Sequence, residues 1–256
     1  SITIIGNSVE LNPNTSINAG SNQDNGNPAN LKVRPAKNIQ MNDFKIDASN
    51  SLLNVILTAG NDIRLNDGTM EINGGEFRAD AGKLFAMENL EINSINNRNL
   101  NGSDISINAD SIEMQQSQIV QKTTASGRTG NININAANSI QLLDESVINS
   151  NTEATGNTGD INIKTDSLLL QENSDILQEA SKAKLGVIDI VVNSIKLLDD
   201  SGFNSIASGT ANAGIINIKT NSFEMRNQSG IGNKTFGSGE HPKFEKIFYR
   251  HPIRVR

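Results

Sequence analysis

The stretch that decides the fold is GNININAANSIQLLDESVINSNTEATGNT, residues 130–158, because the sequence that follows nearly repeats it. Residues 159–185 read GDINIKTDSLLLQENSDILQEASKAKL, with short apolar runs at corresponding places. Self-similarity at a fixed interval is typical of a solenoid, in which one structural unit is stacked on copies of itself.

Two series of serines keep this interval through the second half of the chain. The serines that precede an apolar run are spaced by 28, 28, 27 and 28 residues, and they are Ser111, Ser139, Ser167, Ser194 and Ser222. The serines that stand two places before a large apolar residue are Ser117, Ser146, Ser174, Ser201 and Ser229. Because the two series stay in step, they indicate one repeated unit.

Three short runs of alternating apolar residues fill each unit. In the unit that begins at Gly130 they cover residues 132–134, 140–142 and 147–148, and the next unit has them at 161–163, 168–170 and 175–177. Alternation places one set of side chains on one face of a strand, and no helical period of 3.6 separates the runs. The pattern predicts a parallel β-helix with three strands per coil and about 4.8 Å between coils.

The pattern also predicts the positions of the polar residues within the first strand and of the glycines that precede it. We expect the polar residues of the first strand to face outward, and these are Asn133, Asn162, Asp189 and Asn217. Glycines spaced by 29, 27 and 28 residues precede that strand, and these are Gly130, Gly159, Gly186 and Gly214. Since glycine adopts positive φ without a Cβ clash, we expect it to do so at this turn.

The first hundred residues follow the pattern less regularly. About nine coils are predicted by the polar residues that lead an apolar run, which are Ser8, Asn38, Asp62, Asn89, Ser111, Ser139, Ser167, Ser194 and Ser222. Residues 18–30 have no apolar side chain larger than alanine and predict a projecting loop. We therefore divide the chain into irregular coils at 1–101, regular repeats at 102–240 and a basic non-repeat tail at 241–256.

The composition limits the possible classes of protein. Only 36% of the 256 residues are hydrophobic and none is Trp, so we do not expect a large globular core. There are 38 asparagines, which suit turns, and no cysteine, which excludes disulfides and thiolate sites. No run approaches the roughly 18 apolar residues of a membrane helix. No leader opens the chain, and we expect a processed product or an excised piece.

The net charge of −6 is unevenly distributed. The tail from His241 has five Lys or Arg residues and one Glu, so it carries +4 and the remainder −10. A strongly acidic body does not attract phosphate backbones, and nucleic acid is not expected as a partner.

Residues 155–176, TGNTGDINIKTDSLLLQENSDI, and 212–231, NAGIINIKTNSFEMRNQSGI, resemble the repeats of filamentous haemagglutinin-type exoproteins, especially the cyanobacterial S-layer or haemagglutination-activity proteins. The resemblance implies a right-handed parallel β-helix, export through an outer-membrane transporter by two-partner secretion, and adhesion at the cell surface. Asn12-Pro13-Asn14 is similar to that family's NPNG motif, but Thr15 replaces the glycine, and we interpret the segment as a turn.

An enzyme is the main alternative, since glycoside hydrolysis needs paired carboxylates. The candidate pairs are Asp199-Asp200 and Asp144-Glu145. They fall at the same turn as Gln115-Gln116 and Glu172-Asn173, so we interpret them as a solvated turn.

Three other features are candidate ligand sites. His241 and His251 lie in the tail without a carboxylate cluster, residues 74–80 resemble a calcium repeat that occurs once, and Lys164 and Lys219 form a basic strip interrupted by Val191. We interpret the histidines as part of a tail and the lysines as a solvated face, and we assign no calcium site to residues 74–80 because the motif is not repeated. No catalytic, cofactor-binding or metal-binding residue is assigned.

The sequence thus predicts a non-enzymatic structural or adhesive segment of a secreted or surface protein, which contacts cells or extracellular polysaccharide. A carbohydrate-active β-helix enzyme and a passive spacer remain alternatives.

Overall fold

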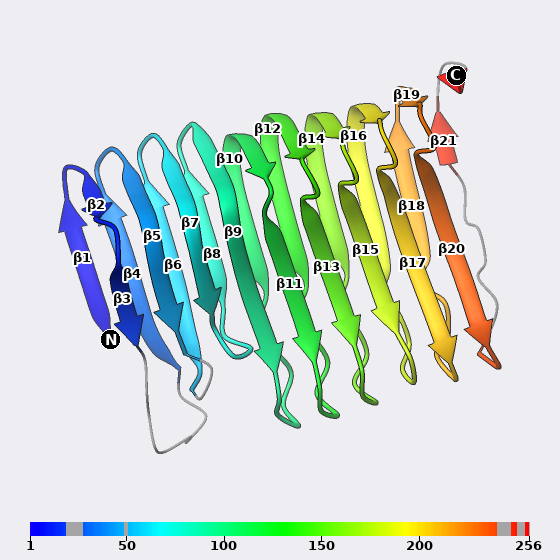
Figure 1. The fold of residues 1–256 in the computed structure, drawn as a ribbon, viewed down its shortest axis with the longest axis horizontal. Helices are drawn as coiled ribbons and strands as arrows, with labels where there is room; N and C mark the ends of the chain where they lie inside the picture. The colour runs from blue at the N-terminus through cyan, green and yellow to red at the C-terminus, as the bar shows by residue number, and fades with distance from the viewer. Residues whose placement is uncertain (19–27, 49–50, 240–246, 250–253, 256) are drawn as a thin grey trace.

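The computed structural model describes residues 1–18, 28–48, 51–239, 247–249 and 254–255. Every element in these ranges is a β-strand, and the strands pair in parallel with strands one coil away. Figure 1 shows the coils stacked in a column with the two chain ends at opposite ends. The predicted all-β parallel solenoid is confirmed.

Each coil has a first, a second and a third strand position. The strands that occupy only the first position of a coil are β1 (Ile2–Gly6), β4 (Ala29–Pro35), β6 (Leu53–Ala59), β8 (Phe77–Ala81), β18 (Ile215–Thr220) and β21 (Ile247–Tyr249). Separate second strands are β2 (Val9–Leu11), β19 (Ser222–Met225) and β22 (Arg254–Val255). Separate third strands are β3 (Thr15–Asn18), β11 (Gln118–Thr123), β13 (Val147–Thr152), β15 (Asp175–Ala180), β17 (Gly202–Gly209) and β20 (Gly230–Gly237).

The remaining strands continue around a corner and fill two positions. Second and third positions are joined in β5 (Ile39–Asp47), β7 (Ile63–Glu71) and β9 (Leu84–Asn96). First and second positions are joined in β10 (Ile105–Gln115), β12 (Ile132–Leu143), β14 (Ile161–Leu170) and β16 (Val187–Leu197). We call the bend between first and second positions the first corner, the next bend the second corner, and the return to the following coil the third corner.

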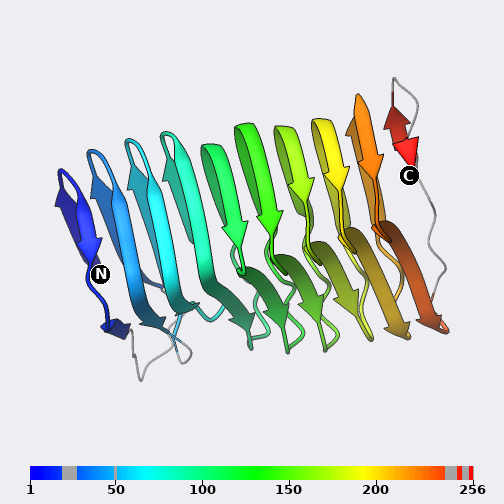
Figure 2. The same cartoon turned by 45° about the horizontal axis from the view of Figure 1, so that its top comes forward.

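The described strands complete nine coils, so eight turns separate the first coil from the ninth. Register follows the repeat, since Ser139 pairs with Ser167 and Ser167 with Ser194. Beyond the ninth coil, β21 pairs with β18 and β22 with β19. The stacking is visible along the whole column in Figure 2. The predicted loop at 18–30 meets β3 at Asn18 and β4 at Ala29, and its residues 19–27 lie outside the described ranges.

One predicted alignment in the early coils is wrong. Asn89 does not lead a second strand, because Leu84 is the residue that pairs with Ser111. Asn89 instead has φ 49° at the second corner of β9. Ile63 pairs with Phe85, 22 positions later, because the third corner between β7 and β8 spans only residues 72–76, whereas that between β11 and β12 spans residues 124–131. The short, uneven spacing of these coils therefore comes from tight corners.

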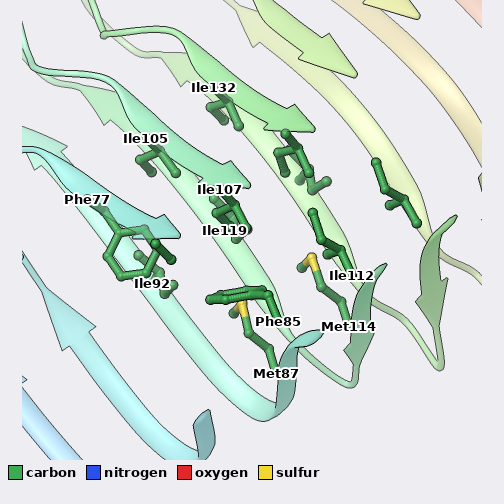
Figure 3. Close-up of a cluster of buried hydrophobic side chains, with 14 of the residues drawn as sticks. Phe77, Phe85, Met87, Ile92, Ile105, Ile107, Ile112, Met114, Ile119 and Ile132 are labelled. Atoms are coloured by element: carbon green, nitrogen blue, oxygen red, sulfur yellow. The ribbon is translucent and has the colours of Figure 1, made fainter. Parts of the chain in front are cut away.

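A continuous hydrophobic core fills the column from coil to coil. In Figure 3, Phe85 and Met87 lie beside Ile112 and Met114 of the next coil, with which they are in register. Each fully buried aliphatic or aromatic side chain contributes roughly 1.5–3 kcal/mol of transfer free energy. The expected outward residues of the first strand are only partly buried, as predicted.

The glycines before the first strand do not have positive φ, which corrects our expectation for Gly130, Gly159, Gly186 and Gly214. In the described residues, positive φ is found for other glycines, such as Gly74 and Gly209. A Cβ on Gly159 would lie 1.9 Å from the carbonyl oxygen of Gly130. Glycine is required there because successive coils approach closely at the third corner.

The core also contains a polar column at the third strand. Long amides alternate with serines in register, and the column comprises Ser94, Gln121, Ser150, Gln178, Ser205 and Asn233. Gln121 and Gln178 each donate from Nε2 to a backbone carbonyl at 2.8 Å, on Ser103 and Gly159 respectively. The amides thereby tie the third strand to the start of the first strand of their own coil.

Candidate functional site

The sequence-predicted acidic pairs lie at the second corner, where the backbone is left-handed. Asp144 and Glu145 have φ 53° and 62°, and Asp199 and Asp200 have φ 56° and 60°. Glu172-Asn173 occupies the same corner of the coil between them, also with positive φ at both residues. The prediction of a turn at these residues is confirmed, and Glu145, Glu172 and Asp200 are exposed.

The carboxylates interact across coils rather than within the predicted pairs. Gln115 donates from Nε2 to Asp144 Oδ2 at 2.6 Å. A hydrogen bond with Glu172, followed in size by the one from Gln115, lowers the pKa of Asp144. The same contact with Asp144 raises the pKa of Glu172, and the negative charge of Asp144 adds to the effect. The two carboxyl groups therefore influence each other across coils, with Asp144 the stronger acid and Glu172 the weaker.

This relation could not be seen from the sequence pairs, because Glu172 stands 28 positions after Asp144 (172 − 144). The signal that could have found it is the repeat itself, since residues one interval apart are neighbours along the column. Asp199 continues the column and accepts a hydrogen bond from Asn227 Nδ2 at 2.6 Å.

In the calcium-like segment at residues 74–80, the side chains of Phe77, Arg78 and Asp80 contact other residues of the protein. Phe77 is buried in the core, and Arg78 Nε lies 2.7 Å from Asp80 Oδ2 on the outside. Asn108 donates to the other oxygen of Asp80 at 2.8 Å. In the described ranges, no group of three or more His, Asp or Glu side chains is placed to hold a metal ion. His241 and His251 lie outside these ranges.

The basic strip lines a groove of about 450 Å³ at the first corner of coils six to nine. Lys164 pairs in register with Val191, which pairs with Lys219, so the two lysines flank the valine along the column. Val191 is 37% exposed, an unusual value for a large aliphatic side chain of this protein. The structure therefore joins these three residues into one surface feature.

The opposite wall of this groove is an amide ladder. Asn193 donates from Nδ2 to Asp166 Oδ1 at 2.9 Å, and Asn221 donates to Asn193 Oδ1. In each coil, one residue separates the two wall residues in the sequence, and these residues are Thr165, Val192 and Thr220. They are largely buried and line the groove. We call this feature, with Lys164, Val191 and Lys219 on one wall and Asp166, Asn193 and Asn221 on the other, the first-corner groove.

A larger hollow of about 620 Å³ lies at the second corner of the first four coils. Two of its charged groups, Lys45 and Asp67, have partners within the protein: Lys45 Nζ lies 3.1 Å from Asp47, and Asp67 accepts from Asn89 at 2.8 Å. Polar groups satisfied in this way have little left to offer a ligand. The first-corner groove, whose lysines have no ion-pair partner in the described part of the chain, is the stronger candidate.

The described residues include no helix long and apolar enough to cross a membrane. Comparison with models of protein families, with curated proteins and with solved structures gave no significant match.

Proposed function

We propose that the chain is a non-enzymatic structural and adhesive segment of a secreted or surface exoprotein. The observation that supports this proposal is one continuous core inside a column whose outer positions recur in every coil. A rigid rod of this kind suits many weak contacts with a cell or an extracellular polysaccharide. Avidity then replaces the single deep pocket of a typical small-molecule site.

Export through an outer-membrane transporter of the two-partner secretion type belongs to the same proposal. The resemblance of residues 155–176 and 212–231 to filamentous haemagglutinin-type repeats supports it. Each coil packs mainly on its neighbours, so coils can be added one at a time as a chain emerges from a pore. An extracellular or cell-surface location follows from this route.

Density-dependent retention tests adhesion. The 256-residue chain is coupled to beads at graded densities, and the beads are washed over cells and over immobilised polysaccharides. Retention that rises steeply with density is expected, because linked weak contacts act together. Beads that are retained at no density would contradict adhesion and leave the spacer alternative.

A carbohydrate-active enzyme is the second candidate, because one observation favours it. Acidic residues of three consecutive coils meet at the second corner, and the pKa values of Asp144 and Glu172 are shifted in opposite directions. Opposite shifts are typical of acid–base pairs. Incubation with polyuronates and neutral glucans, followed by measurement of new reducing ends, distinguishes the candidates: product that disappears in Glu172→Gln would support the enzyme.

A further inference from the structure

The outward column that contains Lys164 changes character between the sixth and seventh coils. In coils four to six its residues satisfy each other, because Asn108 donates to Asp80 at 2.8 Å and Asn135 donates to Asn108 at 3.1 Å. In coils seven to nine Lys164, Val191 and Lys219 replace this amide ladder. Ammonium groups cannot donate to each other, and neither lysine has a hydrogen-bond or ion-pair partner among the described residues.

The neighbouring acid does not neutralise these lysines by direct contact. Asp166 Oδ1 accepts from Asn193, and no ion pair joins Asp166 to Lys164 within the described ranges. The amides of Asn193 and Asn221 each use one N–H for the ladder, which leaves each a second donor. One wall of the groove therefore offers cations around an apolar side chain, and the other offers amide donors.

We infer that the first-corner groove binds an acidic polysaccharide laid along the column axis, an inference that rests on the proposed adhesive function. Lys164 and Lys219 are two coils apart, or about 10 Å at the usual spacing between strands. That separation is close to the length of two sugar units in an extended chain. Each ammonium then meets the carboxylate or sulfate of every second sugar, while Val191 packs against the apolar face of the sugar between them.

Charge complementarity favours a polyanion over a neutral glycan, because the lysines are the groove's unpaired groups. Nucleic acid is a poorer occupant. Affinity for nucleic acid depends on neutralising many phosphates, and this groove supplies two lysines on a chain of net charge −6. A ligand with one anionic group per two sugars matches the spacing of the site.

The test uses calorimetric titration of the 256-residue chain, in low and high salt, with hyaluronan oligosaccharides, which carry one carboxylate per two sugars. Binding that weakens with salt is expected, because the lysines are exposed to screening. The double variant Lys164→Gln/Lys219→Gln should bind about tenfold more weakly, since each exposed ion pair contributes up to about 1 kcal/mol. Val191→Asp should abolish binding, because it removes the apolar contact and places a negative charge between the two lysines.

The matched control is Lys32→Gln/Lys37→Gln, which removes the same charge from the second coil and its following turn. This variant should bind within about twofold of the wild-type chain. Equal binding by both double variants, or equal binding of a neutral oligosaccharide, would overturn the inference. Equal binding of a short DNA duplex would overturn it as well, because the groove would then be a general polyanion site.

Bead retention separates this inference from the proposed function. If Lys164→Gln/Lys219→Gln beads lose retention on acidic polysaccharide and the control beads do not, the groove is the contact surface. If both are retained equally, adhesion stands and the groove assignment fails. If wild-type beads are retained on no surface, the proposed function itself fails.

Discussion

The backbone N–H of Ser146 donates to the side-chain oxygen of Ser174, one coil further along, at 3.2 Å. Ser174 repeats the relation with Ser201 at 3.1 Å, and its own hydroxyl donates to the carbonyl of Gln171 at 2.7 Å. All three serines are fully or almost fully buried at the second corner. Each hydroxyl thus satisfies a backbone donor that the left-handed corner residues leave without a strand partner.

Ser174→Ala should therefore destabilise the column. The change leaves the N–H of Ser146 buried without an acceptor, which costs about 1–3 kcal/mol. Urea denaturation measures the loss. The control is Ser167→Ala, since Ser167 belongs to the other serine series and is exposed. Equal stability of the two variants would show that the buried serine ladder contributes nothing.

Gly159→Ala tests the close approach of coils at the third corner. Its Cβ would stand 1.9 Å from the Gly130 oxygen, so the two coils have to separate, and we expect a loss of several kcal/mol, on the scale of a severe core substitution. The control is Gly230→Ala, because a Cβ on Gly230 meets no atom within 4 Å. Thermal unfolding should give a clearly lower Tm for Gly159→Ala alone. A fall of equal size in the control would point to glycine flexibility instead.

Ile163→Asp should disrupt the neighbouring coils. Ile163 is 1% exposed and pairs with Ile134 and Ile190, so the carboxylate would enter the core without a partner. A loss of β signal in the circular dichroism spectrum is the expected result. Asn217→Asp adds the same charge at an outward position and should keep the signal. An unchanged spectrum for Ile163→Asp would contradict the stacked core.

The repeat interval was enough to predict the architecture, because parallel stacking makes residues one interval apart into neighbours. The same reasoning placed the inward isoleucines and the outward asparagines correctly. The repeat interval does not distinguish two polar residues that could each precede a strand. Asn89 resembles the residue before a second strand but lies at the second corner. Corner geometry depends on backbone conformation, which polar side chains such as Asn and Asp allow but do not dictate.

The sequence leaves the roles of the glycines and of the lysines open for different reasons. Glycine fits both positive φ and close approach, and the sequence cannot distinguish the two causes. The sequence favours a solvated face for Lys164 and Lys219 because Val191 interrupts them, and both lysines are exposed in the structure. Only the fold shows that these residues share a groove with the amide ladder of Asp166, Asn193 and Asn221.

Asp175 provides a test that depends on pH. Burial raises the pKa of its carboxyl group, although hydrogen bonds from the side chain of Asn204 and the N–H of Gly202 act in the opposite direction. Because the folded pKa is above the unfolded value of about 4, folding favours the protonated acid. The stabilising contribution is present below the unfolded pKa and is lost as pH rises through the folded pKa.

Asp175→Asn should therefore be more stable than the wild-type chain at pH 7, by at most about 1 kcal/mol because the group is only partly buried. The advantage should shrink as pH falls and vanish below about pH 4, where the aspartate is protonated as well. Urea denaturation between pH 3 and pH 7 measures the difference. Since burial is the main cause, the advantage should persist in 1 M salt, which screens exposed charges strongly. A difference that disappears in high salt would show repulsion between surface carboxylates to be the cause.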